Sequence, residues 1–213
     1  MMTDETAMAA VLKLLDLHYE SFHDVEPYAT ATGHPVPTDT RGWSQILVSV
    51  LTGVKGLERK KGADLDDGSD VKGANTWEAI DTPRFNGVIK AGTKAASSGN
   101  MTSLDAMPHL YLVLWDDTSR GTARCRIWVV RPQTDPVFRA MCAAWYAKRQ
   151  SGEIVSDNFQ LHPPRGQDTN VIRNTCGNLT YPLYFCAERA ADGSYSVVTY
   201  DAAAPVTGVC SPA

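Results

Sequence analysis

The sequence has no excess of positive charge and no long apolar run. Its 213 residues include 20 Lys and Arg against 24 Asp and Glu, a formal net charge of −4. This net charge excludes a protein held to nucleic acid by bulk positive charge. It does not exclude one that binds nucleic acid through local basic side chains. No stretch approaches the roughly 18 consecutive apolar residues of a membrane span. The acidic start, Met1-Met2-Thr3-Asp4-Glu5, lacks the features of a secretory signal. We therefore expect a cytoplasmic protein without a membrane partner.

Cysteine is scarce, and the signatures of several enzyme classes are missing. The five cysteines are odd in number and far apart, which favours a reducing compartment and argues against a disulfide framework. The spacing of Cys176 and Cys186 does not match a zinc site. The sequence contains no G-x-S-x-G, no glycine-rich phosphate-binding loop and no H-E-x-x-H. It therefore offers no sign of a serine hydrolase, a P-loop nucleotide hydrolase or a zinc protease.

The composition, with 43% hydrophobic and 21% charged residues, is that of a globular protein, and this length favours one domain. Apolar periodicity and turn residues predict helices and strands separated by loops over 27–40 and 91–103. The expected helices are 6–17, 42–51 and 136–148, and the expected strands are 62–66, 69–74, 109–115, 124–130, 181–188 and 195–200. In the strand 124–130, Arg124 and Arg126 alternate with Cys125 and Ile127. This alternation predicts one solvent-facing side.

The informative motif is Asp64-x5-Asp70-Val71-Lys72. Side chains of residues 70 and 72 share one face of a strand, because the side-chain period is two. The turn dipeptide Asp67-Gly68 predicts a hairpin that returns Asp64 to their side. Two carboxylates suit Mg²⁺, which usually retains several waters, and a nearby lysine can orient or deprotonate an attacking water. This set of groups is typical of metal-assisted phosphodiester hydrolysis.

A plainer interpretation of the motif is a solvated acidic turn beside a lysine. An acid-x-Lys triplet is weak by itself, and Glu58-Arg59-Lys60 is a second one. That second triplet has a charged centre and lies outside any expected strand, with no acid closely upstream. Asp70-Val71-Lys72 has an apolar centre, an expected strand and an acid six positions upstream. We therefore prefer it as the site.

The motif resembles the catalytic motif of the PD-(D/E)XK nucleases, the superfamily of most type II restriction endonucleases. The expected element order over 41–148 is similar to that family's core, and Gly42-Trp43-Ser44-Gln45-Ile46-Leu47 resembles the nicking endonuclease MutH and its relatives. The run 67–72, with Asp81-Thr82-Pro83-Arg84-Phe85-Asn86 downstream, resembles restriction enzymes of the MamI type. The resemblance implies an α/β fold with a central mixed sheet flanked by helices. It implies one nuclease domain over 1–213, with a catalytic core at 41–148 and a recognition and sheet-completing part at 150–213.

The resemblance also assigns roles by position. Asp64 and Asp70 would be metal ligands, the Val71 carbonyl a third contact, and Lys72 the group beside the attacking water. Ala63 stands where many members have proline. The helical acid of MutH-like enzymes falls on Val48, with Gln45 or Glu58 as substitutes, so this member of the site stays open. Asp66 and Asp67 are alternatives to Asp64 as the first acid.

Polar residues outside the motif are candidates for DNA contact, because Arg reads guanine and Asn or Gln reads adenine in the major groove. The candidates are Asn75, Arg84, Asn86, Arg173, Asn174 and Asn178. For each of them an ordinary polar loop is the alternative. His162 is more simply a packed or hydrogen-bonded histidine than a general base.

We therefore expect a Mg²⁺-dependent type II restriction endonuclease that cleaves double-stranded DNA at a specific sequence and leaves 5′-phosphate and 3′-hydroxyl ends. A homodimer is expected, because a twofold axis matches a palindromic site. The alternatives are a MutH-like or repair nicking endonuclease, a branched-DNA nuclease and a catalytically inactive DNA-binding module.

Overall fold

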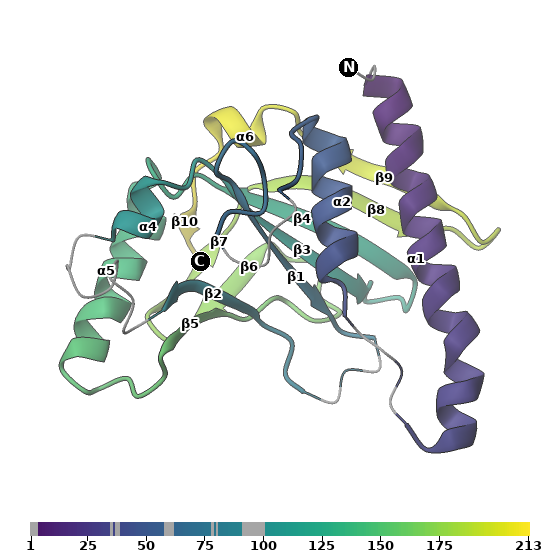
Figure 1. The fold of residues 1–213 in the computed structure, drawn as a ribbon, viewed down its shortest axis with the longest axis horizontal. Coiled ribbons are helices and arrows are strands. Elements are labelled where there is room, and N and C mark those ends of the chain that lie inside the picture. The colour runs from purple at the N-terminus through teal and green to yellow at the C-terminus, as the bar shows by residue number, and fades with distance from the viewer. Residues whose placement is uncertain are drawn as a thin grey trace.

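The computed structural model describes residues 4–34, 36, 39–57, 62–77, 79, 81–90 and 101–213, with the strand assignment alone for 88–90. Its largest sheet has five strands in the order β1-β3-β4-β8-β9 (Figure 1). Strand β1 (Asp70–Asn75) forms one edge and pairs in parallel with β3 (Leu110–Asp117). Strands β4 (Ala123–Val130), β8 (Leu183–Arg189) and β9 (Tyr195–Tyr200) continue it antiparallel. The expected mixed sheet is confirmed.

Two smaller sheets come mostly from segments that carry weak sequence patterns. Strand β2 (Phe85–Lys90) pairs with β5 (Asn158–Leu161). Strand β7 (Gly177–Thr180) lies between β6 (Val171–Asn174) and the C-terminal β10 (Ser211–Pro212). Apart from β2, these strands have four residues or fewer, which is too short for a clear periodicity in the sequence.

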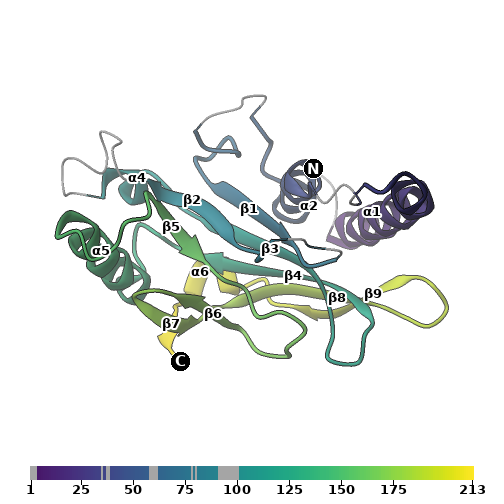
Figure 2. The same ribbon diagram turned by 90° about the horizontal axis from the view of Figure 1, so that it is seen from below.

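Helices cover the main sheet. Helix α1 (Asp4–Thr32) and α2 (Arg41–Thr52) lie together on one side, away from α5 (Pro136–Gln150) (Figure 2). The short helices α4 (Thr102–Asp105) and α6 (Ala204–Thr207) complete the set among the described residues. No helix in the described ranges is long and apolar enough to cross a membrane. The expected helix-flanked α/β architecture is therefore confirmed.

The hydrophobic core has two parts, one on each face of the main sheet. Alternate residues of β1 contribute to different parts: Val71 packs with α1 and α2, while Ala74 packs with β2, β5 and α5. Asp70 and Lys72 share the face of Ala74, because side chains alternate along a strand. The edge strand β1 therefore places the side chains of Asp70 and Lys72 on the face opposite α2.

Three expectations about local structure are wrong. The first helix continues beyond residue 17 to Thr32 and takes in the first part of the expected loop over 27–40, including Pro27, because the buried Phe22 and Ala29 extend its packed side. Residues 62–66 form no strand; Leu65 makes only an isolated bridge with Gly56. Strand β4 has no solvent-facing side, since Arg124 and Arg126 are both buried. The expected loop over 91–103 lies mostly outside the described residues.

Candidate active site

A tight turn brings the first acid of the motif back to the start of β1. The backbone N–H groups of Asp64 and Leu65 both donate to the carbonyl of Ser69, at 3.1 and 3.0 Å. Gly68 adopts a φ of +93°, and a Cβ there would lie 3.2 Å from the carbonyl oxygen of Ala106. Glycine is therefore required at this turn both for its conformation and for its space. The expected turn is present, although it connects to one strand rather than two.

The two acids meet in a buried position. The Asp64 carboxylate accepts a hydrogen bond from the backbone N–H of Val71 at 3.0 Å, and each acid is only 6% exposed. Burial, reinforced by the neighbouring Asp64 carboxylate, raises the pKa of Asp70 to about 6 despite the charge of Lys72. The Lys72 ammonium lies 2.5 Å from the Oδ2 atom of Asp70. Asp64, Asp70 and Lys72 therefore converge as the sequence predicted.

The local backbone adds a third oxygen to this group. The N–H of Asp70 donates toward β3, to His109, whereas the N–H of Val71 points to Asp64 on the free edge of the sheet. Because N–H and C=O of one strand residue point to the same side, the Val71 carbonyl also faces this edge. It lies on the side of the strand where Asp64 is bound.

These groups fit a small hard cation. The Oδ1 atom of Asp70 is buried and has no hydrogen-bond partner, which is costly unless something else binds it. No three acidic, His or Cys side chains converge on a metal position within the described ranges. Mg²⁺ does not need three, because it is usually held by one or two carboxylates together with waters and substrate phosphates.

The other acids of the turn do not compete for the first position. Asp66 is exposed. The carboxylate of Asp67 accepts hydrogen bonds from the N–H and the hydroxyl of Ser69, both at 2.9 Å, and so stabilises the turn itself. Among the three candidates, Asp64 is the one that contacts the start of β1.

Helix α2 packs very closely on β1. A Cβ at Gly73 would lie 2.6 Å from the hydroxyl of Ser44 and 3.0 Å from that of Thr40. The buried Ser44 hydroxyl accepts a hydrogen bond from the indole N–H of Trp115 at 3.1 Å. Glycine at this position of β1 thus permits the first turn of α2 to lie directly over the strand.

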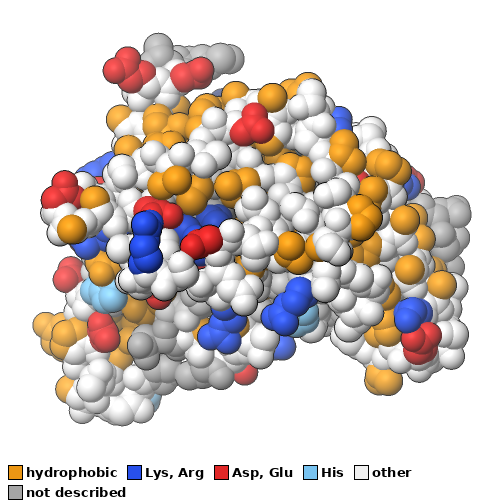
Figure 3. All heavy atoms as spheres, turned by 180° about the vertical axis from the view of Figure 1, so that it is seen from behind, with side chains coloured by type: hydrophobic (Ala, Val, Ile, Leu, Met, Phe, Trp, Pro, Cys, Tyr) orange, Lys and Arg blue, Asp and Glu red, His pale blue; other side chains and the backbone are white. Residues whose placement is uncertain are grey.

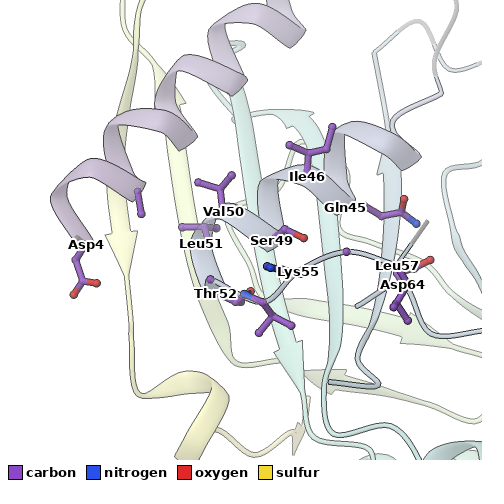
Figure 4. A pocket seen from close by; sticks show the side chains of 14 residues that line it. Asp4, Gln45, Ile46, Ser49, Val50, Leu51, Thr52, Lys55, Leu57 and Asp64 are labelled. Carbon is purple, nitrogen blue, oxygen red and sulfur yellow. The ribbon is translucent and has the colours of Figure 1, made fainter. Parts of the chain in front are cut away.

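The outer side of α2 borders a pocket of about 660 Å³ that ends at Asp64. In Figure 4, Gln45 and Ile46 line it from α2, while Asp64 and Leu57 lie at one end and Asp4 at the other. Gln45 therefore shares a pocket with the first acid. Val48 is fully buried in the core, and Glu58 lies outside the described residues. Of the two substitutes expected for the helical member of the site, Gln45 is the one that lies within the described residues.

Sequence comparison assigns the chain to a family. Residues 27–194 match the family described as MamI restriction endonuclease. This chain belongs to that family. The chain is also 32% identical over 168 aligned positions to "Type II restriction enzyme MamI" of Microbacterium ammoniaphilum. This match covers 74% of this chain and 54% of that protein. The chain thus spans about half the length of this relative. The search of solved structures gave no match.

Four of the expected DNA contacts of this MamI-family chain are exposed side chains: Arg84, Asn86, Arg173 and Asn178. Arg173 lies opposite Asn178 in the β6–β7 hairpin. Burial lowers the pKa of His162, and the charges of Arg173 and Arg84 lower it further. Both guanidinium groups are therefore close to one histidine, although they come from segments far apart in the sequence.

The other two expected contacts are buried side chains with structural partners. Asn75 is 8% exposed, and its side-chain oxygen accepts from the N–H of Trp77 at 2.7 Å. Asn174 donates to the carbonyl of Gln160 and accepts from the N–H of Cys176. Contact with a base would require Asn174 to break these bonds.

Sequence reasoning missed a buried ionic cluster on the same face as Lys72. Asp116 is fully buried and binds Arg124 at 2.9 Å and Arg126 at 2.7 Å. Arg126 also donates to three carbonyls of the β5–β6 loop, those of Pro164, Gln167 and Thr169. The available signal was the acid at the end of β3 together with the two arginines that alternate along β4. The cluster fixes this loop against the main sheet.

Basic side chains of this MamI-family chain do not form a continuous patch on the face shown in Figure 3. Lys and Arg appear there in small separate groups, some next to Asp or Glu. This distribution agrees with the net charge of −4. Contact with a polyanion would rest on individual side chains rather than on a broad positive field.

Proposed function

We propose that this chain is a Mg²⁺-dependent endodeoxyribonuclease that cleaves double-stranded DNA at a specific sequence. One observation carries the proposal: the buried, unpartnered oxygen of Asp70 lies beside a second acid and a lysine. Membership of the MamI restriction endonuclease family supports it. The sequence similarity to a type II restriction enzyme supports cleavage at a specific site.

The carboxylates of Asp64 and Asp70, with the Val71 carbonyl, would hold the ion. When bound, Mg²⁺ supplies a Lewis acid for the scissile phosphate. Lys72, fixed 2.5 Å from Asp70, would orient or deprotonate the attacking water, and its positive charge would offset the charge that develops on the phosphate. Attack at phosphorus with departure of the 3′ oxygen leaves 5′-phosphate and 3′-hydroxyl ends.

For sequence recognition, the exposed Arg84, Asn86, Arg173 and Asn178 have the donors and acceptors that read base edges. Asn75 and Asn174 are weaker candidates, because local structure already uses their side chains. We place recognition mainly in the part 150–213, whose β8 and β9 also belong to the main sheet, and catalysis in 41–148. A homodimer on a palindromic site remains part of this proposal.

The test is cleavage of unmethylated phage DNA and supercoiled plasmid with Mg²⁺. We expect discrete fragments and linear plasmid. We expect Lys72→Ala to lose cleavage and retain DNA binding, whereas Lys13→Ala, an exposed lysine on α1, should cleave like the parent. Near-normal cutting by Lys72→Ala would refute the assignment. Open-circle plasmid alone would indicate a nicking enzyme, and intact DNA bound with Mg²⁺ present would indicate an inactive binding module.

A further inference from the structure

Arg41, the first residue of α2, reaches the candidate active site from the side opposite Lys72. Its guanidinium lies 3.7 Å from the Oδ1 atom of Asp64. The two partners differ sharply in exposure, with 59% of the Arg41 side chain exposed and only 5% of that of Asp64. The acid pair is therefore flanked by two cations, one bound closely and one held loosely at the surface.

The contact between Arg41 and Asp64 is weak enough for Arg41 to exchange this carboxylate for another anionic partner. A distance of 3.7 Å is longer than the roughly 2.7–3.2 Å of a hydrogen bond, so the attraction is mainly electrostatic and reduced by solvent. Lys72, by contrast, lies 2.5 Å from Asp70 and is mostly buried. Lys72 is thus fixed in the site, whereas Arg41 is able to turn toward an incoming ligand.

The start of α2 presents the guanidinium of Arg41 beside Asp64. The helix N-terminus itself is already occupied, because the carboxylate of Asp39 accepts a hydrogen bond from the backbone N–H of Arg41 at 2.9 Å. The close packing of Ser44 on Gly73 fixes this end of the helix over β1. A guanidinium binds phosphate oxygens in pairs. The side chain of Arg41, rather than the helix terminus, is therefore the cationic group that a phosphate beside Asp64 would contact.

We propose that Arg41 is a further catalytic residue that binds the phosphate to be cleaved. This inference rests on the proposed nuclease function. In the protein without DNA, Arg41 offsets the charge of Asp64. When a cation takes over that carboxylate, the guanidinium is released to the phosphate. Arg41 thus contributes a positive charge from the first residue of α2.

The first test is DNA binding with Ca²⁺ in place of Mg²⁺, so that a cation occupies the carboxylates and releases Arg41, measured at several salt concentrations with Arg41→Ala, Arg41→Lys and Arg120→Ala. Arg120 is a matched control, because it is an exposed, ion-paired arginine beyond β3, at the opposite end of the strand from His109. The logarithm of the affinity falls as the logarithm of the salt concentration rises. Loss of one phosphate contact makes this slope less steep by about 0.9. We expect this decrease for Arg41→Ala, with affinity about tenfold weaker, and little change for the other two variants.

The second test is single-turnover cleavage at saturating Mg²⁺, with thermal melting to confirm that each variant is folded. We expect Arg41→Ala to be slowed about 10- to 100-fold and Arg41→Lys to recover part of the rate. An unchanged salt slope in Arg41→Ala, or an equal decrease in Arg120→Ala, would overturn the phosphate contact. If the parent protein fails to cleave, the nuclease proposal fails, while the salt slope still decides whether Arg41 binds phosphate.

Discussion

Replacing Asp70 by Asn should stabilise the protein without divalent ions while abolishing cleavage. The carboxylate of Asp70 is buried, and its pKa rises from 3.8 to about 6 because burial and Asp64 oppose its ionisation. At about 1.4 kcal/mol per pH unit, this difference corresponds to about 3 kcal/mol of destabilisation at neutral pH. Asparagine has the same shape and no charge. We therefore expect Asp70→Asn to raise the free energy of unfolding by about 2–3 kcal/mol at pH 8.

The pH dependence gives this prediction its direction. Because the folded-state pKa lies above the unfolded value, the folded protein binds more protons between about pH 4 and 6, and stability falls as the pH rises through about 6. At pH 4 the carboxyl is mostly protonated in the folded state, so the substitution should change stability little. The gain should develop mainly between about pH 4 and 6, where the unfolded and folded pKa values lie, and then remain constant.

Urea denaturation in EDTA at pH 4.5 and pH 8 measures this difference. Asp66→Asn is a suitable control, because Asp66 is an exposed acid in the same turn. It should change stability little at either pH. If Asp70→Asn is instead less stable than the parent at pH 8, the carboxylate contributes net stability through Lys72, and the argument from burial is wrong. If the gain is equal at both pH values, its origin is not the ionisation of Asp70.

Three further predictions concern packing, the buried charges and recognition. Gly73→Ala should cost about 1–3 kcal/mol of unfolding free energy, measured in urea, because its Cβ would lie 2.6 Å from the hydroxyl of Ser44. Asp116→Asn should cost about 3–5 kcal/mol by the same assay, since two buried arginines would lose their acid. Arg173→Ala should raise the pKa of His162 in an NMR titration and relax cleavage specificity at one position of the site. An unchanged value in any of these would contradict the corresponding contact.

Local sequence patterns were sufficient for the elements that carry strong signals. Helix α5 begins as expected, because Asp135 accepts hydrogen bonds from the N–H groups of Val137 and Phe138 and Pro136 occupies the first turn. Helix α2 ends at Gly53, whose φ of +70° suits glycine. The pair β3 and β4 also follows its apolar patterns. In each case residues close in sequence determine the structure.

The β4 expectation failed because burial depends on what covers a strand. The alternation of Arg124 and Arg126 with apolar residues is typical of a half-exposed strand, yet Asp116 and the β5–β6 loop cover both arginines. The carbonyls of that loop that bind Arg126 lie 38 to 43 residues beyond it in the sequence. No local pattern indicates that it folds back over this face.

The sequence alone indicated the chemistry of the candidate site. Asp64, Asp70 and Lys72 lie within one turn and one strand, so their residue types and spacing can be recognised locally. Only the tertiary structure decided which acid of the turn contacts β1, how deeply Asp70 is buried and that Arg41 reaches Asp64. These properties arise where α2, the turn and the sheet edge pack together. Packing between distant segments sets burial, and burial sets the charge balance of the site.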